Sequence, residues 1–188
     1  LHKMLIGYAF GFVGLEDKMT DKYMISLAHP QLIANFGVVS SLLFSITYST
    51  FGVYAGVLSS KLNRSAMLGL ACICWSLTSI GSGLAPSFTV FCLLRVALGL
   101  FCSVGYPAGY GLIADYFPPS YRSTANALES SGSYVGAAVA SLSILAIKQV
   151  GWRACYTAIG AAGVIWGALF LLLVREPKRG AFDPPCEQ

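Results

Sequence analysis

The chain has 188 residues, of which 56% are hydrophobic and only 11% are charged, and its formal net charge is +4. Soluble domains carry roughly a quarter charged residues, so this composition excludes a soluble globular protein and indicates a membrane protein. The basic residues are dispersed among the connections between apolar stretches, a distribution that gives no support for nucleic-acid binding.

Long apolar stretches predict membrane-crossing helices, because a hydrocarbon core about 30 Å thick needs about 20 apolar residues per helix. In chain order, the stretches that meet this length lie at about 37–58, 66–85, 87–112, 124–147 and 153–174. A further span at about 4–30 is interrupted by charges of both signs, which can compensate one another. The alternative for 4–30 is a short interfacial helix followed by a second helix. We therefore expect an all-α membrane protein with a six-helix bundle over 1–174 and a basic, then polar tail over 175–188.

The basic residues alternate between the two ends of such a bundle. One end collects Lys3, Lys61, Arg64, Arg122, Arg175, Lys178 and Arg179, whereas the other has Lys148 and Arg153. The positive-inside rule then places both termini and the loops 59–65 and 116–123 on the cytoplasmic side, or its topological equivalent. Lysosomal, plasma and mitochondrial inner membranes all fit this pattern.

Pairs of glycines four residues apart predict close helix packing within the bilayer. The pairs are Gly52 and Gly56, Gly105 and Gly109, Gly132 and Gly136, and Gly163 and Gly167. Their occurrence in four different spans favours a tightly packed bundle.

Charged residues at bilayer depth are the candidate binding residues, because each costs at least about 2.5–3.5 kcal/mol to place there. These residues are Asp21, Lys22, Arg95 and Glu129. One interpretation is a polar cavity in which Asp21 or Glu129 takes up a proton while Arg95 or Lys22 attracts an anionic group. The other is that they form buried pairs that only fix helix positions.

Enzymatic and metal chemistry find no support in the sequence. It has no phosphate-binding G-x-x-x-x-G-K-[ST], no H-E-x-x-H and no G-x-S-x-G motif. The C-I-C at 72–74 lacks the spacing of a metal site and has no nearby histidine. We expect no enzyme activity, no metal and no cofactor.

Three segments, in order, resemble the N-terminal half of the major facilitator superfamily. "GVLSSKLNRS" at 56–65 is similar to the family's loop between spans 2 and 3, with Ser60 where that loop has an acid. "LIADYFPPSYRSTANAL" at 112–128 resembles the connection from span 4 to span 5, and "VREPKRGAF" at 174–182 the exit from span 6 into the central loop. Within the superfamily, "TDKYMISLAHPQL" at 20–32, "LLRVALGL" around Arg95 and the ending at 175–180 are most similar to the spinster-like branch.

The resemblance implies a transporter of two six-helix halves that binds its substrate near the midplane. It implies a proton-linked carrier of a small amphiphilic or anionic solute such as a lysolipid, with this chain as the N-terminal half. Asp21 would be the proton-sensitive acid, and Arg95 its partner or the anion contact. The cytoplasmic gate motif would comprise Gly56, Leu58, Ser60, Lys61, Arg64, Asp115 and Arg122.

Two departures from the family pattern leave a second hypothesis open. Ser60 replaces the gate acid, and Cys102 stands where the branch has a glutamate in span 4, for which Glu129 is a candidate substitute. The partners expected of a carrier are the lipid bilayer, the solute, H⁺ and a second six-helix half, in the same polypeptide or another chain. The alternative is a transport-inactive, membrane-embedded structural subunit of a larger membrane complex.

Overall fold

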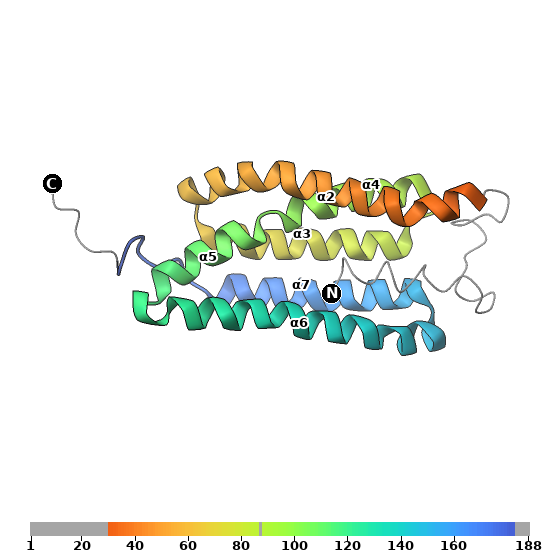
Figure 1. Ribbon diagram of the computed structural model, residues 1–188. Coiled ribbons are helices and arrows are strands. Elements are labelled where there is room, and N and C mark those ends of the chain that lie inside the picture. The colour runs from red at the N-terminus through yellow and green to blue at the C-terminus, as the bar shows by residue number, and fades with distance from the viewer. Residues whose placement is uncertain (1–29, 87, 183–188) are drawn as a thin grey trace.

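The computed structural model describes residues 30–86 and 88–182. In chain order its helices are α2 (Pro30–Lys61), α3 (Arg64–Leu84), α4 (Phe88–Cys102), α5 (Gly105–Tyr116), α6 (Pro119–Val150) and α7 (Trp152–Leu173). They lie side by side as an elongated bundle (Figure 1). The predicted all-α fold is confirmed, and the expected span at about 4–30 falls outside the described residues.

Five segments of the described chain are long and apolar enough to cross a bilayer. They are Leu42–Lys61, Arg64–Leu84, Val90–Tyr116, Pro119–Ile147 and Trp152–Leu173. α2 and α6 extend beyond the predicted apolar stretches at both ends, whereas α3 and α7 match theirs to within two residues. A helix ends at its caps rather than at the edge of the hydrocarbon. Asn63 caps α3 by accepting a hydrogen bond from the Ala66 N–H at 2.7 Å, and Pro119 stands at the first turn of α6.

The fourth span, which the sequence predicts as one continuous helix over 87–112, is broken into α4 and α5. The break falls at Ser103 and Val104, which form a turn between the two helices. Pro107 has no N–H to donate to the Ser103 carbonyl, so the regular ladder cannot continue across this point. The Ser103 hydroxyl donates to the Leu100 carbonyl at 2.7 Å, at the end of α4.

Glycines bring α3 and α7 into the closest contact in the bundle. A Cβ atom at Gly160 would lie 2.8 Å from the Ser76 carbonyl oxygen, and one at Gly167 would lie 2.8 Å from the Ile73 side chain. In contrast, Gly52, Gly56, Gly109 and Gly132 have nothing within 4 Å of an added Cβ. Close approach therefore occurs at Gly167 but not at those other four members of the predicted pairs.

The connections gather at two ends of the bundle. Residues 62–63, 117–118 and 174–182 lie together at one end, on the left in Figure 1, whereas 85–86 and Gly151 lie at the other. The first end, which we call the charged end, carries Lys61, Arg64, Arg122, Arg175, Lys178 and Arg179. The alternation of basic residues in the sequence therefore corresponds to a difference between the two ends of the described bundle.

Candidate functional site

The charged end is organised around an ion pair between Arg64, the first residue of α3, and Asp115, near the end of α5. The Arg64 guanidinium also donates to the Gly111 carbonyl at 2.9 Å and to the Ser59 carbonyl at 3.2 Å. Gly111 makes room for it, since a Cβ there would lie 3.0 Å from the guanidinium carbon. The pair is largely buried, with side-chain exposures of 18% for Arg64 and 7% for Asp115.

The segment after α7 closes over this pair. The second Asp115 oxygen accepts a hydrogen bond from the Gly180 N–H at 3.0 Å. Gly180 has φ +65°, a left-handed conformation that glycine adopts without a steric penalty. Asp115 thus joins the start of α3 to the segment that follows the last span.

Glu176 joins the same two parts of the chain a second time. Its carboxylate accepts hydrogen bonds from the backbone N–H groups of Arg64 at 3.1 Å and Ser65 at 2.8 Å. The first N–H groups of a helix lack partners within it and carry partial positive charge, so a carboxylate is favoured there. Partial burial raises the pKa of Glu176, but the hydrogen bonds from Ser65 and Arg64 and the nearby Arg179 outweigh it, so the pKa lies below its ordinary value.

Arg179 joins the segment after α7 to the loop at 59–65, where the resemblance to the family led us to expect an acid at position 60. Its guanidinium donates to the backbone carbonyls of Ser60 and Leu62. The Ser60 hydroxyl donates back to the Val57 carbonyl at 2.7 Å and stays exposed. The Ser60 side chain therefore contributes no charge, and its backbone carbonyl holds the cation.

The sequence motif predicts that Arg64 and Asp115 belong to one site, and the structure brings them together. The sequence did not predict that Glu176, Arg179 and Gly180 belong to the same site. One signal for Glu176 was present, because an acid directly after an apolar span is available to a neighbouring helix N-terminus. The partner helix, however, precedes it by more than a hundred residues, so its identity needs the fold.

The remaining residues of the expected gate motif lie at the same end but outside the ion pair. Lys61 and Leu58 are exposed on the last turns of α2, and the Gly56 carbonyl accepts from the Ser59 hydroxyl at 2.8 Å. The Arg122 side chain donates to the Phe117 carbonyl at 3.2 Å, across the start of α6.

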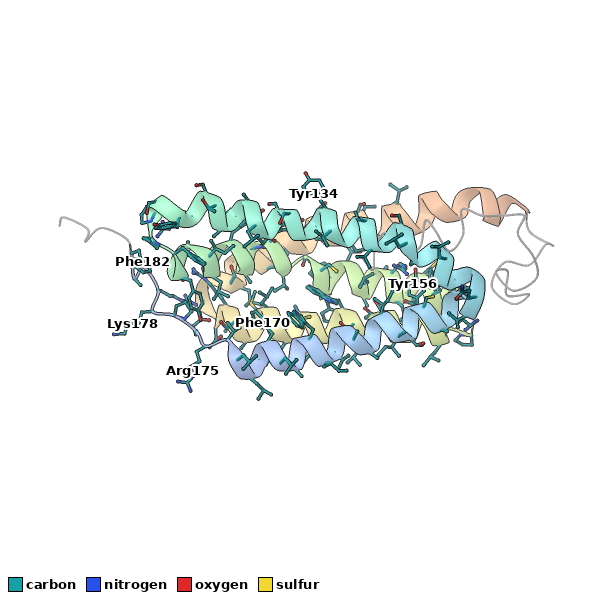
Figure 2. The ribbon with its side chains drawn as sticks, turned by 90° about the horizontal axis from the view of Figure 1, so that it is seen from below. Tyr134, Tyr156, Phe170, Arg175, Lys178 and Phe182 are labelled. Atoms are coloured by element: carbon teal, nitrogen blue, oxygen red, sulfur yellow. The ribbon has the colours of Figure 1, made fainter. Side chains whose placement is uncertain are left out.

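Arg95 is a separate, deeply buried cation, 2% exposed, on α4. Its guanidinium donates to the Tyr156 hydroxyl of α7 at 2.9 Å and lies over the rings of Phe91, at 4.8 Å, and Tyr156, at 5.5 Å. Trp152 packs edge-on against both rings. No carboxylate of the described residues pairs with this charge, and its Nε atom lacks a hydrogen-bond partner. Figure 2 labels Tyr156 within the bundle.

Of the candidate proton and anion residues, the structure describes only Arg95 and Glu129, and these two form no ion pair with each other. Glu129 is exposed on α6 and forms no ion pair with any residue of the described ranges. Asp21 and Lys22 lie outside the described residues.

The described chain is thus a bundle of membrane-crossing helices whose ends are tied together by largely buried charges at one end. The family model of the Major Facilitator Superfamily matches residues 5–187. The chain belongs to the major facilitator superfamily, and it is an integral, multi-pass membrane protein, as predicted.

The sequence relatives are named as transporters of organic acids. A probable L-galactonate transporter of Escherichia coli (strain K12) is 30% identical over 134 residues, which are 71% of this chain and 30% of that protein. A hexuronate transporter of Bacillus subtilis (strain 168) is 27% identical over 146 residues, 76% of this chain and 34% of that protein.

One structural relative is a bacterial homologue of the human lysosomal transporter Spinster, in an inward-facing and occupied conformation. The TM-score is 0.69 at 24% sequence identity, over 97% of this chain and 45% of that one. The predicted spinster-like resemblance is thus confirmed as a likeness of fold. This chain spans less than half the length of each of these relatives.

Proposed function

We propose that this chain is the N-terminal half of a secondary active transporter that moves a small organic anion, coupled to protons. Family membership and the two sugar-acid transporters among the relatives support this function. A sugar acid carries a carboxylate, which suits a site that contains an unneutralised guanidinium. These relatives favour a compact hydrophilic acid over the lysolipid that the spinster-like resemblance implies.

The observation that carries the proposal is the closed network at the charged end. Arg64, Asp115, Glu176 and Arg179 tie the ends of α2, α3 and α5 to the segment after α7. Alternating access works largely by rigid-body rocking of one half against the other, which requires each half to move as a unit. The network ties these ends together in spite of the serine at position 60, as a half that moves as one unit requires.

Arg95 is the proposed anion contact. A guanidinium at bilayer depth without a carboxylate partner is expensive and is retained where it serves a function. The Tyr156 hydroxyl and the two rings hold it in place, and its buried Nε atom has no hydrogen-bond partner. Asp21 and Glu129 are the proposed proton carriers, and Lys22 a second cation for the solute.

A second six-helix half, in the same polypeptide or another chain, would complete the cavity, because one half can provide only one wall of it. The charged end would face the cytoplasm or its equivalent, as the positive-inside rule expects. Both chain termini would then lie on that side.

Ligand-dependent thermal stability tests this function. The protein is purified from its membrane together with any polypeptide that stays bound to it, and its unfolding temperature is measured with L-galactonate or with neutral L-galactose. A ligand at about 100 times its dissociation constant stabilises by about 2.7 kcal/mol, which gives a clear shift. We expect a shift with the acid alone. An equal shift with both sugars, or none with either the galactonate or a hexuronate, would count against an organic-anion carrier and favour the structural-subunit hypothesis.

A further inference from the structure

Three cationic side chains at the charged end take no part in the closed network or in the other side-chain hydrogen bonds of the described residues. Lys61, Arg175 and Lys178 are exposed, and their side chains make no ion pair or hydrogen bond with the described residues. Arg64 and Arg179, in contrast, are engaged by a carboxylate and by backbone carbonyls. The charge of these three residues is therefore free for an external ligand.

The network brings Lys61 near the segment that carries Arg175 and Lys178. Arg179 binds the carbonyls of Ser60 and Leu62, the two chain neighbours of Lys61, so Lys61 lies beside the segment that carries Lys178. Figure 2 shows the labelled side chains of Arg175 and Lys178 projecting away from the bundle at this end. Glu176, between them in sequence, directs its carboxylate to the N-terminus of α3. The Glu176 carboxylate is therefore bound to α3 and does not pair with Arg175 or Lys178.

Apolar side chains border the cations on the membrane side. Leu172 and Leu173, in the last turn of α7, are 79% and 76% exposed. Arg175 follows Leu173 by two residues, which places the cation where an apolar helix surface ends. Phe182, 43% exposed and labelled in Figure 2 at the same end, adds an aromatic side chain of the type found at membrane interfaces.

We propose that Lys61, Arg175 and Lys178 form a binding site for the headgroup of an anionic phospholipid in the adjoining leaflet. The phosphodiester oxygens would accept hydrogen bonds from the ammonium and guanidinium groups, and the acyl chains would lie against Leu172 and Leu173. Free phosphate would use the cations but not the leucines, so the arrangement favours a lipid. The site is independent of the transported solute and of the proposed function.

Native mass spectrometry of the detergent-solubilised protein tests the site. Phosphatidylglycerol and phosphatidylcholine with identical acyl chains are titrated in parallel, and retained lipid is measured for the wild type and for R175Q/K178Q. Each cation near an anionic lipid contributes about fivefold in affinity, so the double variant should bind phosphatidylglycerol about 25-fold more weakly, with phosphatidylcholine unchanged. The charge-preserving variant R175K/K178R is the matched control and should keep most of the binding. K61Q should lose about fivefold, because Lys61 belongs to the same site, and unchanged binding by K61Q would contradict its inclusion.

Three results would overturn the proposal. One is equal retention of both lipids by the wild type, and another is unchanged phosphatidylglycerol binding in R175Q/K178Q. The third is displacement of phosphatidylglycerol by millimolar inorganic phosphate, which would identify a phosphate site instead. The unfolding temperature of each variant is measured alongside, and we expect no change because these side chains are exposed.

Discussion

The carboxylate of Glu176 accepts a hydrogen bond from the backbone N–H of Arg64 at 3.1 Å, although the two residues are 112 positions apart in the chain. The same Arg64 uses its side chain for Asp115 at the end of α5. One residue thus links the start of α3 to two distant parts of the chain, once through its backbone and once through its guanidinium.

Substitution of Glu176 by glutamine should lower the stability of the protein in a pH-dependent way. The carboxylate complements the positive N-terminus of α3, an effect of about 0.5–1 kcal/mol for a partly solvated group. Because the folded state lowers its pKa below the ordinary 4.5, the stabilisation is present above that pH and is lost as the pH falls through the folded pKa. The difference in unfolding temperature between wild type and Glu176→Gln should therefore be full at pH 7 and shrink below about pH 4.5. A difference in unfolding temperature that stays constant over this pH range would mean that the negative charge of Glu176 does not stabilise the folded protein.

The side chains of Arg64 and Asp115 should be strongly coupled in their contributions to the free energy of unfolding. Exposed pairs are worth up to about 1 kcal/mol, and loss of one partner of a fully buried pair costs about 3–5 kcal/mol. For this partly buried pair we expect a coupling of about 2 kcal/mol from a double-mutant cycle with Arg64→Gln and Asp115→Asn, measured by unfolding. Additive effects of the two substitutions would show that the two side chains act independently.

The glycine contacts between α3 and α7 predict opposite outcomes for two similar substitutions. Gly160→Ala places a Cβ 2.8 Å from the Ser76 carbonyl and should destabilise the protein by about 1–3 kcal/mol. Gly132→Ala, in open space on α6, is the matched control and should be neutral or stabilising by about 0.5–1 kcal/mol. Equal effects at the two positions would contradict the close packing of α3 on α7.

Arg95 should be dispensable for folding. A buried charge without a carboxylate partner can be replaced by an apolar residue of similar length at little or no cost in stability. Arg95→Met should therefore unfold at the same temperature as the wild type or above it. Tyr156→Phe keeps the ring but leaves the guanidinium without its hydroxyl partner, which should cost about 1–3 kcal/mol. If Arg95→Met is instead strongly destabilised, the arginine has a structural role.

Much of the fold was predictable because the bilayer imposes simple rules. Apolar length identified the five described spans, and the distribution of basic residues matched the two ends of the bundle. The break at Ser103 could also have been predicted, because Pro107 stands four residues later and lacks the N–H that the helical hydrogen-bond pattern needs. It was not predicted because the apolar stretch runs without interruption across this point.

The site was predictable only where one motif named both partners, as for Arg64 and Asp115. The rotation of α4 that points Arg95 at Tyr156 depends on which helix lies beside it, and an apolar sequence carries little of that information. The same limit explains the glycines: Gly52 and Gly56 have the spacing of a contact, but Gly160, which belongs to none of the predicted pairs, makes one. Glu176 was likewise missed because its partner is a helix end, which is a property of the fold.

Uptake of labelled L-galactonate into proteoliposomes tests the central claim most directly. The protein is reconstituted with any second half that co-purifies, and an inward proton gradient is applied with and without an uncoupler. We predict gradient-dependent uptake of the acid by the wild type, its abolition by the uncoupler, and its loss in Arg95→Met although that variant remains folded. No uptake by a folded wild-type assembly of any tested sugar acid, or full uptake by Arg95→Met, would contradict this account.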